Sequence, residues 1–234
     1  MQNNEEDREP LGLPADCRGG QSVVTLTYGA IAMVPVIGAL IQAALNVAYP
    51  GPQAVADREW MEEVVQRLNN LEEHGNLDVE ALMDDVRFDR VVRRIVQEVR
   101  NEGEQEKREA YKSLIINYAQ GRTFAEFEEK KLLGYLERYS ALHLQTLSLM
   151  ENPKRRFPNS GGLLVSSTPT LLKSAFPKYS DEVLERVYSD LMEDGLVSKM
   201  IYGATMSGNG AYVTRTTPLG KKMLHIIEPA TEAT

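Results

Sequence analysis

Hydrophobic residues recur at helical spacing through the middle of the chain, three or four positions apart, which predicts a series of amphipathic helices. The first apolar series consists of Trp60, Val64, Leu68 and Leu71. It predicts a helix that Asp57 caps and that His74-Gly75-Asn76 ends, because glycine favours the residue after a helix. A second helix is expected over about residues 77–101, with an interruption near residues 84–88, and it carries Val91, Val92, Ile95, Val96 and Val99 on its apolar side.

The next stretch predicts two antiparallel helices. One runs from about Glu104 to Ala119 and stops at Gly121, and the sequence Thr123-Phe-Ala-Glu126 matches a capping box that opens the other. This second helix is expected to continue to Asn152-Pro153. Its inward face would be formed by Phe127, Leu132, Leu136, Tyr139, Leu142, Leu147 and Met150. The middle of the chain therefore predicts an all-α domain that ends near Glu151.

The pattern changes after a segment rich in proline, glycine and serine (residues 152–169), which is typical of a linker. A short helix over residues 170–175 and a longer one from Ser180 to Asp194, closed by Gly195, come next. Residues 196–202 and 211–216 then predict two strands joined by the turn Ser207-Gly208-Asn209-Gly210. A last helix is expected at residues 221–228. This order of helix, helix, hairpin and helix is typical of a small winged-helix module.

The N-terminal part of the chain has a different pattern. No charged residue occurs from Gly19 to Ala56, a run of 38 positions. Its apolar centre is long enough to cross a hydrocarbon layer of about 30 Å as a helix. The residues expected to make a membrane or oligomer contact are Ile31, Val34, Pro35, Ile37, Leu40, Ile41 and Leu45. A soluble helical hairpin, broken near Pro35 and buried by other helices, is the second interpretation, because Gln42 would need a partner in lipid.

The composition excludes several classes of protein. A single cysteine, Cys17, excludes a disulfide scaffold and a zinc ribbon, and the formal net charge of −8 argues against a protein that coats nucleic acid. Residues 57–112 contain 16 acidic and 10 basic residues. These mixed charges are interpreted as solvated faces of the predicted helices.

The charges of the predicted winged helix favour a protein partner over DNA. The helix in the recognition position, residues 181–194, carries six acidic residues and Arg186 as its one basic residue, so phosphates would repel it. Basic residues on the side of the wing, which are the candidates for a nucleic-acid contact, are Lys199, Arg215, Lys221 and Lys222.

No group of residues indicates a reaction. His74, His143 and His225 stand far apart without a neighbour at metal-ligand spacing, and His143, between two leucines, is interpreted as a hydrogen-bonded interior histidine. Cys17 lies in a polar segment, and the chain has no G-x-S-x-G sequence that would present a serine nucleophile. We therefore expect a protein without catalytic residues, metal or cofactor.

Four segments together resemble the abortive-infection alpha family of bacterial and phage-borne helical proteins. They are Val34-Pro35-Val36-Ile37-Gly38, Arg58-Glu59-Trp60, Glu106-Lys-Arg-Glu-Ala-Tyr-Lys-Ser-Leu-Ile-Ile-Asn117 and Thr217-Pro-Leu-Gly-Lys-Lys-Met-Leu224. The resemblance spans about residues 25–228 and implies a role in phage defence. It implies no catalytic residues.

The expected fold is mainly α, with an N-terminal apolar helical segment and a helical bundle followed by a small α+β winged-helix module. The expected parts are an acidic tail (1–22), an apolar helical segment (23–56), a helical body (57–151), a linker (152–169), a winged-helix-like module (170–228) and a short tail (229–234). The expected function is that of a non-enzymatic phage-defence factor, cytoplasmic and associated with the inner membrane, that also binds a protein partner or a second copy. The alternative is a soluble winged-helix regulator or adaptor whose apolar segment forms a dimer.

Overall fold

The computed structural model describes residues 52–78, 81–82, 84–156, 167–199, 202–203 and 213–229. All of them belong to one compact unit, Ala48–Thr234. The core of the uncharged run, with the predicted contact residues between Ile31 and Leu45, and the predicted turn at residues 207–210 lie outside the described residues.

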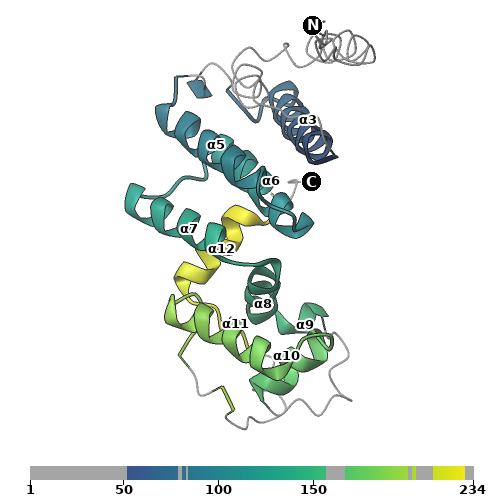
Figure 1. Cartoon of the computed structure of the whole chain (residues 1–234). Coiled ribbons are helices and arrows are strands. Elements are labelled where there is room, and N and C mark those ends of the chain that lie inside the picture. The colour runs from purple at the N-terminus through teal and green to yellow at the C-terminus, as the bar shows by residue number, and fades with distance from the viewer. Residues whose placement is uncertain are drawn as a thin grey trace, which may run out of the picture. The chain divides into compact units, whose positions relative to one another are not determined.

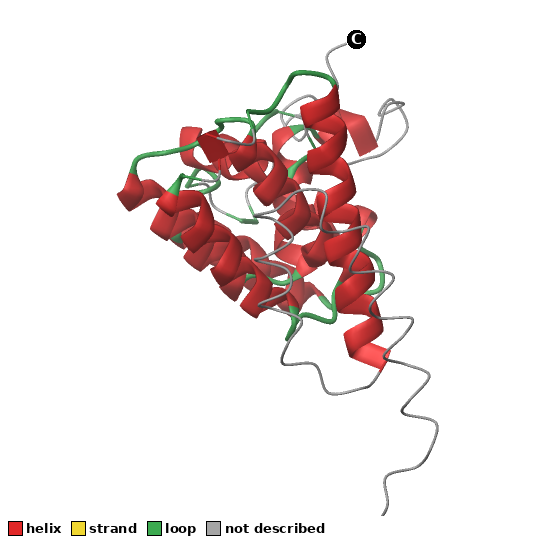
Figure 2. Cartoon of the chain, turned by 90° about the horizontal axis from the view of Figure 1, so that it is seen from above, coloured by secondary structure: helices red, strands yellow, loops and turns green. Residues whose placement is uncertain are grey.

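The described residues form helices joined by loops (Figures 1 and 2). The helices are α3 (Pro52–Glu73), α5 (Val86–Val99), α6 (Gln105–Ala119), α7 (Glu126–Arg138), α8 (Ala141–Glu151), α9 (Pro153–Arg156), α10 (Thr168–Ala175), α11 (Asp181–Glu193) and α12 (Pro218–Ile227). The described ranges contain no strand, and a single antiparallel bridge joins Val197 to Thr216. The prediction of a mainly α protein is confirmed.

Local chemistry at the helix ends explains most boundaries. Gly75, Gly121 and Gly195 all have positive φ values of 70°, 80° and 75°, and each follows the end of a helix where the sequence predicted a stop. Asp85 caps α5 by accepting hydrogen bonds from the backbone N–H groups of Arg87 and Phe88, at 2.7 and 3.2 Å. The predicted interruption near residues 84–88 is therefore the start of α5.

Helices α3 and α12 begin earlier than the sequence predicts. α3 begins at Pro52, so Asp57 lies inside the helix instead of capping it. Proline is tolerated in the first turn of a helix because no hydrogen bond is required of its nitrogen there, and this allows the earlier start. At the other end of the chain α12 begins at Pro218, with the Thr217 side chain accepting from the Gly220 N–H at 3.1 Å, three residues before the predicted start.

The helix predicted to run from the Thr123 capping box to residue 152 is in fact two helices. Ala125 occupies the N-cap of α7 and makes no side-chain bond, so the predicted capping box does not form. The chain then leaves the helical conformation at Tyr139 and Ser140, where Ser140 and His143 form a capping box for α8. Phe127, predicted to face inward, is 77% exposed.

Helix α6 lies at the centre of this unit and contacts α3, α5 and α12. Residues 110–118 are all buried, and so are Lys107 and Arg108 in the first turn. The interpretation of the charges of residues 57–112 as solvated faces is wrong for Asp57, Lys107, Arg108 and Lys112, all of which are less than one tenth exposed.

Each of these buried charges is paired with an opposite charge of the same chain. Burying a charge costs much less free energy when it is paired and hydrogen-bonded. Arg108 donates to the Asp57 carboxylate at 3.0 Å and to the backbone carbonyls of residues 56, 99 and 102 at 2.9, 2.9 and 3.3 Å. Lys107 pairs with Glu102 at 2.6 Å, and Lys112 pairs with Glu63 and, at 2.7 Å, with Glu109.

The C-terminal helices join the same interior. α10 packs on α11, α11 on α8, and α12, yellow in Figure 1, packs against both α6 and α8. The Asn117 side chain of α6 donates to carbonyls at the end of α12, those of Ile226 and Glu228, both at 2.9 Å. Within the predicted linker, α9 occupies residues 153–156 and α10 begins at Thr168.

Candidate functional site

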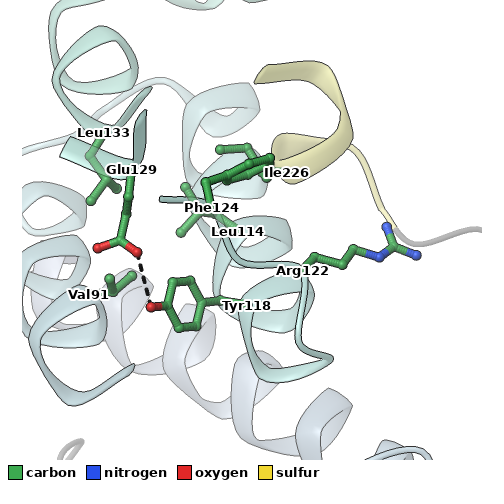
Figure 3. Close-up of a pocket in the computed structure, with 8 residues that line it drawn as sticks. All are labelled: Val91, Leu114, Tyr118, Arg122, Phe124, Glu129, Leu133 and Ile226. Carbon is green, nitrogen blue, oxygen red and sulfur yellow. Dashed lines mark hydrogen bonds between the residues drawn. The ribbon is translucent and has the colours of Figure 1, made fainter. Parts of the chain in front are cut away.

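A small cavity lies where α5, α6, α7 and α12 meet (Figure 3). Its volume is about 20 Å³, which is the room that one water molecule needs. Apolar side chains from all four helices form most of its wall: Val91, Leu114, Leu133 and Ile226. A cavity of this size leaves no space for a substrate.

One edge of this cavity is polar. The Tyr118 hydroxyl donates to Glu129 at 3.1 Å, and Arg87 donates to the same carboxylate oxygen at 2.7 Å and to the carbonyl of Phe124 at 2.9 Å. Burial and the nearby negative charge of Glu129 raise the pKa of Tyr118 to about 12, so its hydroxyl remains protonated at neutral pH. Arg122 extends away from this group in Figure 3 and donates to Asn117 at 3.1 Å. The polar groups thus hold α5, α6 and α7 together.

The four basic residues predicted to contact nucleic acid do not share an environment. Arg215 is only 3% exposed, its guanidinium lies 3.9 Å from the Met150 sulfur, and burial lowers its pKa. Lys199 is exposed. Lys221 and Lys222 are neighbours on α12 but pair with different helices, Lys221 with Glu151 at 3.7 Å and Lys222 with Glu128 at 2.5 Å.

Helix α11 has one apolar and one acidic side. Its buried residues are Leu184, Val187, Tyr188 and Leu191. The acidic residues on its outer side, all exposed, are Asp181, Glu182, Glu185 and Glu193. Arg186, 80% exposed, pairs with Asp190 at 3.2 Å. The outer side of α11, together with the 42%-exposed Val183, is an acidic surface that suits a cationic partner.

Among the three histidines, His143 lies in the most structured environment. It is half-buried on α8 and hydrogen-bonded to Ser140 and Asp190, which confirms the interpretation of an interior histidine. His74 is exposed and bonds the Asn70 carbonyl at 2.6 Å, and His225 is exposed on α12. The described part of the chain holds no group of three His, Cys, Asp or Glu side chains placed to bind a metal ion.

Sequence reasoning missed a row of three stacked rings. Tyr135 and Tyr139 stack with ring centres 5.7 Å apart, and Tyr139 stacks on His143 at 4.8 Å with nearly parallel planes. The Tyr135 hydroxyl donates to the backbone carbonyl of Asp194, at the end of α11, at 3.1 Å. The Tyr139 hydroxyl donates to the Asp194 carboxylate at 2.5 Å, and Arg138 pairs with the same carboxylate. The four-residue spacing of Tyr135, Tyr139 and His143 could have indicated this row, because residues four positions apart lie on one side of a helix. The break at residue 140 was not foreseen.

Two further observations bear on function. No helix in the described ranges is both long and apolar enough to cross a membrane. Comparison of the chain with protein-family models, curated proteins and solved structures found no match. A proposal for the function therefore rests on the chain's own residues and on its resemblance to the abortive-infection alpha family.

Proposed function

We propose that this protein is a non-enzymatic bacterial phage-defence factor whose apolar segment, residues 23–49, contacts the inner membrane. Its C-terminal helices, in a winged-helix-like order, bind a protein partner. The role in phage defence follows from the resemblance to the abortive-infection alpha family. The observation that carries the membrane contact is the run of 38 residues without a charge.

The apolar character of this run supports a cover of lipid. Leaving a large apolar side chain in water costs about 1.5–3 kcal/mol, and the run contains many of them.

A protein partner is supported by the charges of the C-terminal helices. The helix in the recognition position presents carboxylates on its exposed side, and Asp and Glu repel phosphates. Of the basic residues that would compensate, Arg215 is buried and Lys222 is paired with Glu128. A cationic segment of another protein fits this surface better than a duplex does.

Cell fractionation of the full chain tests the membrane contact. We expect the native chain to pellet with membranes under phage challenge, and the double variant Leu40→Asp/Ile41→Asp to remain in the soluble fraction, since two charges in the apolar run oppose insertion. The matched control Gln42→Asn keeps the run uncharged and should pellet like the native chain. Recovery of the native chain in the soluble fraction, with and without phage, would overturn the proposal.

Plaque counts on cells that express the same variants test the role in defence. We expect the native chain and Gln42→Asn to reduce plaque numbers, and Leu40→Asp/Ile41→Asp to lose this protection. Circular dichroism of each variant checks that the helical unit is folded. Equal plaque numbers with and without the native chain would remove phage defence while leaving the membrane contact to be judged by fractionation.

A soluble winged-helix regulator is the second candidate, favoured by the antiparallel bridge between Val197 and Thr216 where a hairpin was predicted. It requires binding to duplex DNA that weakens with added salt and weakens further in Lys199→Ala and Lys221→Ala. It also requires a dimer that Leu40→Asp/Ile41→Asp disrupts, measured by light scattering. No retention on DNA at low salt would eliminate this candidate.

A further inference from the structure

The first turn of α8 determines which nitrogen of His143 carries a proton. The Ser140 backbone N–H points at His143 Nδ1 over 3.2 Å, and the Ser140 hydroxyl lies 2.9 Å from the same nitrogen. A backbone N–H can only donate, so Nδ1 must be the acceptor and carries no proton. The ring proton then belongs to Nε2, which faces the Asp190 carboxylate of α11 at 3.4 Å.

The His143 ring thus connects two helices, and it depends on being neutral to do so. On one side it closes the capping box of α8 together with Ser140. On the other side it donates to Asp190, a carboxylate that also pairs with Arg186. A proton added to Nδ1 would place two donors face to face, so the Ser140 N–H would lose its partner.

Charged and titratable groups surround the ring on every side. From the end of α7, Tyr139 stacks on it and Arg138 adds a positive charge nearby. From α11, Asp190 adds a negative charge. From the segment before α6, Glu104 adds another, and this carboxylate also accepts the Ala141 N–H at 2.8 Å.

We propose that His143 is a proton-sensitive latch at the junction of α7 and α8, closed when its ring is neutral and opened when Nδ1 takes a proton from solvent. Opening breaks the bond from the Ser140 N–H and forms an N–H on the ring. The new positive charge strengthens the contact with Asp190, so the ring stays with α11 while the α8 cap is lost. Acidification then loosens the start of α8.

The direction of the pH effect follows from the burial of the ring. Burial lowers the pKa of His143 below its ordinary value of 6.5, and the opposing effects of Asp190 and Glu104 do not outweigh it. A histidine with a lowered pKa in the folded state favours the fold when neutral, and this contribution is complete above its ordinary pKa. It is lost as the pH falls from about 6.5 toward the lower pKa of the folded state.

Hydrogen exchange of the Ser140 amide in the full chain, followed by NMR against pH, tests the latch. We expect the protection factor of this amide to fall at least about threefold between about pH 7.5 and about pH 5.5. In His143→Gln, whose side-chain oxygen can accept the same N–H as in an ordinary capping box, the protection factor should be independent of pH over this range. In His143→Ala it should be low throughout.

Two further variants separate this latch from a general effect of acid. His225→Gln removes an exposed histidine of α12 and should leave the native pH dependence unchanged. Asp190→Asn removes the negative charge that favours the charged ring, so the loss of protection should move to lower pH. The same pH dependence in His143→Gln as in the native chain, or an NMR spectrum with Nδ1 protonated at about pH 7.5, would overturn the proposal.

Discussion

Helices α6 and α11 resemble each other at their C-terminal ends and differ in their surroundings. Both are followed by a glycine with positive φ, Gly121 and Gly195, as their sequences predict. α6 is surrounded by α3, α5 and α12 and is buried around most of its circumference, whereas α11 buries one side and exposes carboxylates on the other. Apolar spacing therefore identifies the buried face of a surface helix correctly but cannot show that a helix is enclosed.

The charged residues of the two helices consequently have different roles. In α6 the side chains of Lys107, Arg108 and Lys112 are buried and paired with carboxylates from other parts of the chain and from α6 itself. In α11 Arg186 is exposed and pairs with a residue one turn away. Buried pairs are costly to break on one side, whereas exposed pairs contribute little.

The largest expected effect is that of Arg108→Ala. This change removes the cation beside Asp57 and the donor to three backbone carbonyls in the interior. We expect the free energy of unfolding to fall by about 3–5 kcal/mol, measured by urea denaturation followed by circular dichroism. Arg186→Ala is the matched control on α11 and should cause no measurable change. Equal effects of the two variants would contradict the contrast between the helices.

A pair of glycine variants tests how tightly α12 closes onto the end of α11. A Cβ atom at Gly220 would lie 2.1 Å from the Leu196 carbonyl oxygen, so the backbone must shift to accommodate it. We expect Gly220→Ala to lower the free energy of unfolding by about 1–3 kcal/mol in urea denaturation.

The control for this variant is Gly134→Ala on α7, where the added Cβ would meet no atom within 4 Å. Alanine is a better helix former than glycine, so this change should raise the free energy of unfolding by about 0.5–1 kcal/mol. If both Gly220→Ala and Gly134→Ala stabilised the protein, α12 would not approach the Leu196 backbone as closely as the structure indicates.

The smallest effect is expected at the cap of α11. Ser180 accepts the Val183 N–H at 3.4 Å, whereas Glu104 in the same position of α6 makes no cap bond. The first turn of α6 is stabilised instead by the buried ion pairs of Lys107 and Arg108. Ser180→Ala should lower the free energy of unfolding by about 1 kcal/mol, measured by thermal denaturation. Ser174→Ala, on the exposed side of α10, is the control and should change the melting temperature little. A change at Ser180 no larger than this control would show that the cap is unimportant.

Much of the fold could be predicted because helix ends depend on neighbouring residues. The cap at Ser180 and the helix ends at Gly75 and Gly121 depend only on residues a few positions apart. The break at Ser140 was missed although the capping box that forms there is local as well, because histidine replaces the glutamate or glutamine that the pattern expects. Phe127 was misplaced because α7 starts at Glu126, which turns its first residues away from the core.

The sequence by itself determined the helical class, most helix ends and the acidic outer side of α11, because these depend on residues a few positions apart. Only the tertiary structure decided that Arg108 lies inside the protein, that Arg215 is buried and that Tyr139 meets Asp194. Arg108 and Asp57 are 51 positions apart, and Tyr139 and Asp194 are 55 apart. Whether a charged or polar side chain is solvated or enclosed depends on which distant helices pack over it, and no local pattern records that.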